Sequence, residues 1–317
     1  MSFTEFFEEE PPVITIEPKV EPKADKKHHA KKAKTVSFSQ YAMHKKCPHQ
    51  WELAYLKKLH VYSDSIHTIF GTAVHDVLQK YIALLYDKGA PAADAYEIID
   101  DFVERFTKLR STAHFDKDAP NEEEFQSFVQ DGKDILTWLT RPVNRMRYFP
   151  SRMYTVLGVE LPLRVSVKNG LTYVGYLDIV LEHRQTKMIK ILDFKTSTRN
   201  WNKWQKADPA KTDQLVLYKK FYSDQKNVPL ENIEVEFFIL VRTLFEGYGQ
   251  QGRVATFAPA HGKGTVKKTV ASFEAFLDAG FLPTGEYNTE GVFPKTDNKN
   301  ICKWCEFYKK ECQGAGS

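Results

Sequence analysis

The sequence contains 317 residues, of which 42% are hydrophobic and 27% are charged. This composition belongs to a folded globular protein and excludes a chain that is disordered throughout. The formal net charge of +4 permits nucleic-acid binding but does not by itself indicate it. No apolar run reaches the length that spans a bilayer, and the acidic start MSFTEFFEEE lacks the basic and apolar regions of a secretory signal. We therefore expect an intracellular, cytoplasmic protein without a membrane segment.

The N-terminal part of the chain predicts a charged tail. Residues 1–35 are poor in apolar side chains and include the run KADKKHHAKKAK, which either contacts DNA phosphates or is simply a solvated tail. Order is expected to begin near Ser37, which together with Gln40 fits a helix capping box. The proline in Cys47-Pro48 should interrupt the helical stretch that follows.

A second helix is marked by apolar residues at helical spacing over residues 74–85, with His75 beside the stripe. Two further helical patterns cover residues 96–106 and 125–146. We interpret this helical block, over about 88–150, as an insertion in one domain that covers residues 36–317.

The pattern then changes to strands. Alternating or continuous apolar runs predict strands over residues 159–165, 172–181, 188–194 and 234–241, with a helix around 215–221 before the last of them. The order of helix, three strands, helix and strand predicts an α/β fold with a mixed central sheet flanked by helices.

A pair of acidic residues lies on the second and third strands. The short polar turn 183–187 favours an antiparallel hairpin, which places Asp178 across from Asp193 or within two residues of it. Asp193 and Lys195 are two residues apart and share one strand face, whereas Phe194 points into the core. The two carboxylates suit Mg²⁺ or Mn²⁺ as ligands. The ammonium group beside them suits the chemistry of a phosphoryl group, where negative charge develops. The alternative is an ordinary surface hairpin with a salt-bridged Asp–Lys pair.

The segments GYLDIV and ILDFKTS, on strands in this order, resemble the core motif of the PD-(D/E)XK nucleases, in the RecB-like exonuclease branch with a restriction-endonuclease-like core. The segment GTAVHDVLQKY resembles the helix of that branch that supplies a metal-binding histidine, and a Q-x-x-x-Y helix follows the lysine. The resemblance implies metal ligands at His75, Asp178 and Asp193. It implies a catalytic set of His75, Glu160, Asp178, Asp193, Lys195, Gln214 and Tyr218. Singly, a helix histidine, a strand glutamate or a helix tyrosine is also an ordinary structural residue.

The four cysteines suggest a second metal site. The C-terminal segment has the spacing C-x2-C-x6-C, and one cysteine precedes the nuclease motifs. Four thiolates, from Cys47, Cys302, Cys305 and Cys312, suit either a tetrahedral Zn²⁺ or an iron–sulfur cluster. The arrangement resembles that of AddB-type nucleases and CRISPR-associated exonucleases, which implies a 4Fe-4S cluster that ties the ends of the domain together. The cysteine cluster spans residues 302–312.

Basic and aromatic residues alternate after the lysine motif. Arg199, Trp201, Lys203 and Trp204 suit DNA that is single-stranded or has single-stranded ends, because cations follow phosphates and rings stack on bases. The alternative is a loop whose tryptophans pack on the body of the protein. The basic segment HGKGTVKK near Lys263 is interpreted as a loop, and no phosphate-binding loop motif is present. Any unwinding would then come from a separate helicase or recombination protein.

The sequence thus predicts a metal-dependent deoxyribonuclease, and the resemblance implies an exonuclease, in DNA repair, recombination or phage-type DNA processing. One alternative is a nuclease-fold subunit that binds DNA or assembles with partners without cleaving. Another is an iron–sulfur or zinc protein that senses redox state, but that function leaves the acidic hairpin without an explanation.

Overall fold

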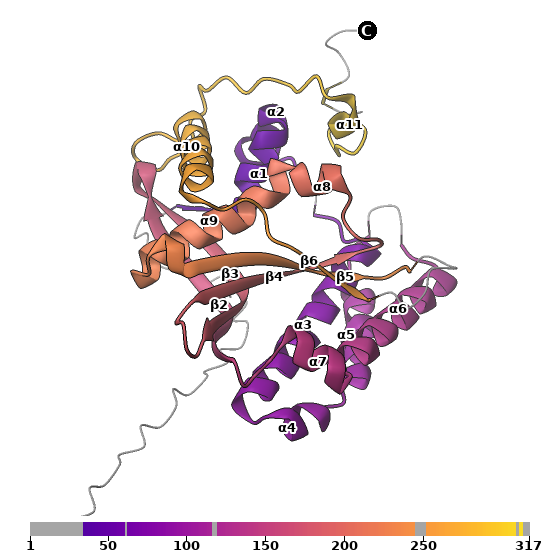
Figure 1. Cartoon of the computed structure of the whole chain (residues 1–317). Helices are drawn as coiled ribbons and strands as arrows, with labels where there is room; N and C mark the ends of the chain where they lie inside the picture. The colour runs from indigo at the N-terminus through magenta and orange to yellow at the C-terminus, as the bar shows by residue number, and fades with distance from the viewer. Residues whose placement is uncertain (1–33, 61, 116–118, 245–251, 309–310, 313–317) are drawn as a thin grey trace, which may run out of the picture.

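The computed structural model describes residues 34–60, 62–115, 119–244, 252–308 and 311–312 (Figure 1). Of the tail expected over residues 1–35, residues 1–33 lie outside the described residues, and Thr35 is the first residue of a strand. Within these ranges, every helix is either too short or too polar to cross a lipid bilayer.

The described residues form one mixed sheet of six strands, which confirms the predicted fold class. The strands are β1 (Thr35–Val36), β2 (Tyr154–Val167), β3 (Leu171–His183), β4 (Ile189–Ser197), β5 (Ile233–Val241) and β6 (Val254–Phe257). Five of the strands are hydrogen-bonded in the order β1-β3-β4-β5-β6. β2 lies off this path and pairs with β3. The β1–β3 and β4–β5 pairs are parallel, and the remaining pairs are antiparallel. The sequence had not indicated β1 or β6.

The two faces of the sheet bury different cores because side chains alternate along each strand. On β4, Leu192 and Phe194 belong to one apolar cluster, whereas Ile191 belongs to the other. β5 alternates in the same way. Each face is covered by its own layer of helices, so the fold has three layers (Figure 1).

The first helical layer contains the long helix α3 (Ile66–Asp87) and the predicted helical block. Ser65 caps α3 with a capping box formed with Thr68. The block consists of α4 (Ala90–Asp94), α5 (Ile98–Thr112), α6 (Glu122–Thr140) and α7 (Pro142–Tyr148). Its aromatic side chains share one core with α3 and with Phe194 of the sheet, so the block packs against the sheet through α3.

The second layer contains α1 (Phe38–Lys46), α8 (Lys203–Ala207), α9 (Pro209–Lys226) and α10 (Lys263–Gly280). Ser37 is the N-cap of α1, but its side chain makes no capping hydrogen bond, so the predicted capping box is wrong. The loop interpretation near Lys263 is also wrong, because this residue begins α10. Val266, Phe273 and Leu277 give that helix its buried face, and this periodicity outweighs the two glycines at its start.

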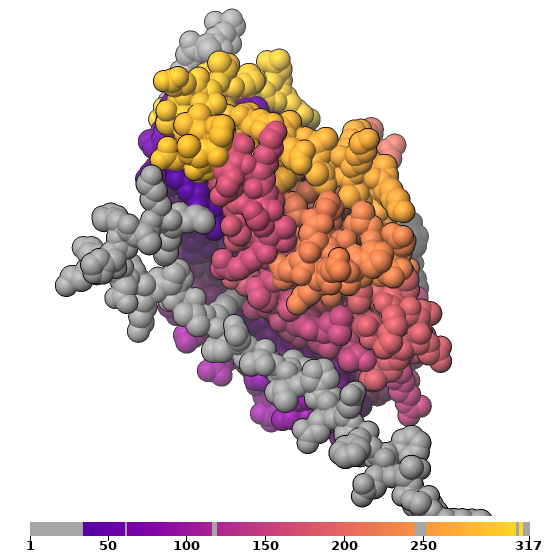
Figure 2. All heavy atoms as spheres, turned by 90° about the vertical axis from the view of Figure 1, so that its left-hand side faces the viewer, coloured from indigo at the N-terminus to yellow at the C-terminus, as the bar shows by residue number. Residues whose placement is uncertain are grey.

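The C-terminal segment returns to the N-terminal helices. Pro48 begins α2 (Pro48–Trp51), which continues as a π-helical turn, Glu52–Leu56. The ring of Trp51 packs among the rings of Phe276, Phe281, Tyr287 and Phe293, and the backbone N–H of His49 donates to the carbonyl of Pro294 at 3.2 Å. These contacts bring α11 (Lys299–Cys302) back towards α2. The C-terminal atoms, in yellow, lie against the N-terminal helices in Figure 2.

Candidate active site

Asp178 and Asp193 lie where β3 and β4 separate. The last pair in this ladder is Ile179 with Leu192, so the two aspartates are the next residues on their strands. Asp178 Oδ2 accepts a hydrogen bond from the backbone N–H of Phe194 at 2.6 Å. A side chain, rather than the backbone of β3, therefore satisfies this amide. The hairpin brings the two carboxylates together, as the short turn predicted.

Glu160 adds a carboxylate from β2. The β2–β3 register pairs the residues on either side of Glu160 with those on either side of Asp178, so these two acids face each other across the strands. Glu160 has a φ of +49°. For a residue other than glycine this backbone conformation costs about 1–3 kcal/mol, and such strain is concentrated at functional sites.

Asp193 and Lys195 form a close ion pair beside this row of acids. The Lys195 Nζ lies 2.6 Å from Oδ2 of Asp193, although this contact lacks hydrogen-bond geometry, since Oδ2 is buried without a hydrogen-bond partner. Asp193 is only 3% exposed. Burial raises its pKa to about 6, and the charge of Asp178 adds to this effect while Lys195 opposes it. Burial alone would lower the pKa of Lys195, but the neighbouring carboxylates raise it.

His75 reaches the site from α3. Its Nδ1 lies 3.9 Å from Oδ2 of Asp178, and its ring packs edge-on against Phe194 with the centroids 5.7 Å apart. One helical turn earlier, a Cβ added to Gly71 would lie 3.2 Å from the hydroxyl oxygen of Thr196. The glycine therefore permits the close approach of α3 to β4 that places the imidazole beside the carboxylate.

An open groove of about 320 Å³ runs along α3 to this cluster. His75, Glu160 and Lys195 line it, together with His67, Thr68, Gly71, Thr72, Asp76, Phe194 and Thr196. The sequence argument had not indicated His67. Its spacing of eight residues from His75 places it on the same helix face, two turns away, and this periodicity is the signal that would have found it.

Gln214 and Tyr218 lie together on α9, on the other side of the site from α3. The amide of Gln214 donates a hydrogen bond to the Tyr218 hydroxyl at 3.0 Å. Burial raises the pKa of Tyr218, and the charge of Asp193 adds to this effect. The tyrosine therefore remains protonated and faces the buried aspartate. A Cβ added to Gly175 would lie 3.1 Å from the Tyr218 ring, so this glycine makes room for it.

The fold brings the four cysteines towards one another. Cys47 is buried between α1 and α2, and the other three are partly buried. Burial raises the pKa of the Cys305 thiol, and Cys312 and Cys47 raise it further. Cys312 is affected in the same way by burial, by Cys47 and by Cys302. These mutual effects place residues from opposite ends of the chain in electrostatic range.

No group of three or more His, Cys, Asp or Glu side chains in the described ranges is arranged as a metal site. The donor chemistry nevertheless fits a hard cation at the acidic cluster, because Asp193 Oδ2 is a buried carboxylate oxygen without a hydrogen bond and Asp178 lies beside it. The four thiols are free of disulfides and suit a soft metal or an iron–sulfur cluster.

The expected DNA-contacting residues fall into two groups. Trp201 is 7% exposed, and its ring centroid lies 4.9 Å from that of Phe237. This tryptophan therefore packs on the body of the protein, which was the alternative to contact with DNA. Trp204 is 73% exposed, and the Lys203 Nζ lies 4.9 Å from its ring centroid. Arg199 is exposed as well. An aromatic surface for bases therefore remains only at the second tryptophan of this pair.

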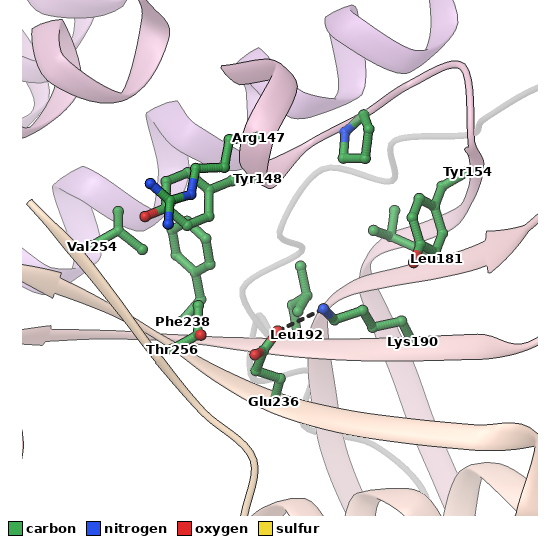
Figure 3. A pocket seen from close by; sticks show the side chains of 11 residues that line it. Arg147, Tyr148, Tyr154, Leu181, Lys190, Leu192, Glu236, Phe238, Val254 and Thr256 are labelled. Atoms are coloured by element: carbon green, nitrogen blue, oxygen red, sulfur yellow. Dashed lines mark ion pairs between the residues drawn. The ribbon is translucent and has the colours of Figure 1, made fainter. Parts of the chain in front are cut away.

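A second hollow of about 440 Å³ lies under α7 and shares no lining residue with the groove (Figure 3). Lys190 and Glu236 form an ion pair of 2.6 Å in it, drawn as the dashed line. Phe238, which lines the hollow, also packs against Phe194. The hollow and the acidic cluster therefore lie in different parts of the sheet, and Lys190 is a lysine of β4 outside the candidate active site.

The model of the PD-(D/E)XK nuclease superfamily matches residues 35–313. No curated protein matches the chain significantly.

Proposed function

Because the chain belongs to the PD-(D/E)XK nuclease superfamily, we propose that it is a metal-dependent DNA nuclease that hydrolyses phosphodiester bonds. The observation that carries the proposal is the convergence of Asp178, Asp193 and Lys195 at the point where β3 and β4 separate. An open groove leads there, so a polymer backbone can reach the acidic cluster.

Asp178, Asp193 and His75 would hold a Mg²⁺ or Mn²⁺ ion. Two adjacent carboxylates, one with a buried oxygen that lacks a hydrogen bond, support this assignment. When bound, such an ion lowers the pKa of a water molecule and stabilises charge on a phosphoryl oxygen. The domain that carries this site would extend from residue 36 to 317, with the helical insertion over about 88–150.

The side chains around the acids have distinct roles in this proposal. Lys195 orients the attacking water or neutralises negative charge that develops on the phosphate, since this residue lines the groove and its ammonium is held beside Asp193. Tyr218, held protonated and hydrogen-bonded to Gln214, positions the buried Asp193 or the substrate. Glu160 faces the groove opposite Asp178 and assists in binding the ion or its waters.

The motif resemblance supports a RecB-like enzyme that acts as an exonuclease in DNA repair, recombination or phage-type DNA processing. Arg199, which precedes α8, and Lys203 and Trp204 at the start of α8 are exposed and suit DNA with single-stranded ends. A separate helicase or recombination protein would supply unwinding. Such a protein would act in the cytoplasm on cellular or phage DNA.

The cysteines would hold a 4Fe-4S cluster, with Zn²⁺ as the alternative. The mutual effects of Cys47, Cys305 and Cys312 on their pKa values support a shared site. The cluster would be structural, because it joins the N-terminal helices to a segment more than 250 residues later in the chain.

The test compares cleavage of end-labelled single- and double-stranded DNA with Mg²⁺, Mn²⁺ or EDTA by anaerobically purified protein. Lys195→Ala is compared with Lys190→Ala, because these two lysines of β4 have side chains that are 32% and 30% exposed. We expect metal-dependent cleavage that is lost in Lys195→Ala and kept in Lys190→Ala. No cleavage by the folded wild type, or equal cleavage by both variants, would instead support a DNA-binding or assembly subunit.

A further inference from the structure

Three aromatic rings form a continuous platform next to the catalytic lysine. Trp201 lies between β4 and α8, Phe237 is on β5 and Phe257 is on β6. The Trp201 and Phe237 centroids are 4.9 Å apart. Phe257 stacks on Phe237 with the centroids 6.3 Å apart and an angle of 9° between the rings, and it lies 6.4 Å from Trp201.

Each ring of the platform carries one lysine. The Lys195 Nζ lies 5.9 Å from the Phe237 centroid. The Lys211 Nζ lies 4.9 Å from the centroid of Trp201, and the Lys206 Nζ lies 5.5 Å from that of Phe257. The three ammonium groups come from β4, α9 and α8. Tertiary packing therefore brings together three lysines that belong to separate elements.

Among the residues that the structure describes, two of these lysines have no ion-pair partner. Lys195 pairs with Asp193, but within the described part of the chain neither Lys206 nor Lys211 forms a salt bridge. Both are only partly exposed, and their ammonium groups lie over the rings. Burial lowers the pKa of Lys211, Asp208 opposes this effect, and repulsion from Lys46 and Lys195 lowers it further. Gathering such cations is unfavourable unless an anion joins them.

Phosphates, rather than bases, are the groups that this surface fits. Phe237 is fully buried and Trp201 is 7% exposed, so neither presents a free face for stacking. The rings instead restrict the ammonium groups by cation–π contact. Three ammonium groups held over neighbouring rings, one of them that of Lys195, match the repeating charge of a nucleic-acid backbone.

We propose that Lys206 and Lys211 bind the backbone phosphates of the DNA strand next to the scissile phosphate and thereby position it at Lys195. This inference rests on the proposed nuclease function and deepens it. In it, Trp201 acts indirectly, by holding Lys211, whereas the exposed Trp204 lies where bases can stack. Lys206 and Lys211 are positioning residues that bind substrate without taking part in the chemical step.

The test measures binding of a fluorescent single-stranded oligonucleotide in EDTA, by anisotropy, at several salt concentrations. Lys206→Ala/Lys211→Ala is compared with wild type and with Lys80→Ala. Lys80 also lies over an aromatic ring, 4.2 Å from the Tyr96 centroid, but it is on α3, in the helical layer on the other face of the sheet from α8 and α9. We expect the double variant to bind roughly tenfold more weakly, with a salt slope that is less steep by about 0.7 for each lysine. Lys80→Ala should resemble the wild type.

Three further measurements distinguish the possible failures. Lys206→Arg/Lys211→Arg should regain most of the binding, because it keeps both charges on the rings, and thermal unfolding shows whether each variant is folded. In cleavage assays with Mg²⁺ over a range of DNA concentrations, the alanine substitutions should raise KM more than they lower kcat. If the folded alanine variant binds DNA with the wild-type affinity and salt slope, the inference is overturned and the nuclease proposal stands. If the wild type neither binds nor cleaves DNA, both fail.

Discussion

Asp193 is buried beside Lys195, whose ammonium nitrogen lies 2.6 Å from its Oδ2, and yet the pKa of this aspartate is raised to about 6. Burial and the adjacent Asp178 together outweigh the attraction of the lysine. In the absence of a bound cation, the protein therefore holds an acid that is costly to ionise, and this free-energy cost can be measured.

We expect Asp193→Asn to stabilise the metal-free protein at pH 8. The folded-state pKa of about 6 exceeds the unfolded value of about 3.9, so the folded state binds the proton more tightly. Stability of the wild type consequently falls as the pH rises through this window, and the penalty is fully present above about pH 6. The gain from asparagine should be about 1–3 kcal/mol at pH 8 and vanish near pH 4. Urea unfolding at both pH values measures it; a variant less stable than the wild type at pH 8 would contradict the cause given for the shift.

Metal binding should depend on pH through the same group. A proton competes with the cation for the Asp193 carboxylate, so the affinity for Mn²⁺ should weaken about tenfold per pH unit below a pH of about 6. Titration calorimetry with Mn²⁺ between pH 5 and pH 8 measures this, and Asp193→Asn is the control that should lose most of the affinity throughout. An affinity independent of pH over this range would exclude Asp193 as a ligand.

Asp213 should be a strong contributor to stability, because it joins three helices. It accepts hydrogen bonds from Tyr41 at 2.8 Å and Thr269 at 3.2 Å and pairs with Lys45 at 2.5 Å. Asp213→Ala should lower the free energy of unfolding by about 2–4 kcal/mol, since it leaves these donors without an acceptor. Asp224→Ala, on the same helix but in an exposed pair, should change it by less than about 0.5 kcal/mol. Similar losses in chemical denaturation of both variants would argue against a special role for the buried network.

Replacing Cys305 should remove metal and stability together. If the four thiolates share one cluster, Cys305→Ala opens a link between distant parts of the chain, and the loss should be roughly 3 kcal/mol or more, as for a cross-link across a long loop. Iron and zinc analysis, the visible spectrum and the thermal midpoint are measured on anaerobic protein. Trp304→Ala is the matched neighbour, because its side chain is 83% exposed. A colourless, metal-free wild type of undiminished stability would rule out the site.

Two helical glycines should respond to alanine in opposite directions. A Cβ at Gly132, in α6, would collide with the buried ring of Phe102, whereas a Cβ at Gly264, in α10, would meet nothing. Gly132→Ala should therefore destabilise by about 1–3 kcal/mol. Gly264→Ala should stabilise by up to about 1 kcal/mol through helix propensity. Thermal unfolding of the two variants checks this; stabilisation by both would mean that α6 can shift away from α5.

The sequence by itself determined the features that lie within one element or one hairpin. Strand periodicity and a short turn predict that Asp178 and Asp193 approach each other and that Lys195 shares a face with Asp193, because these distances depend on local backbone geometry. The spacing of Gln214 and Tyr218 on one helix predicts their contact for the same reason.

The contacts between distant elements are defined only by the tertiary structure and could not be predicted from the sequence. In the folded protein Trp201 packs against Phe237 and β1 pairs with β3, and Lys206 and Lys211 lie over rings from other parts of the chain. Such placements depend on the sum of many weak packing contacts across the whole core, none of which leaves a local pattern in the sequence.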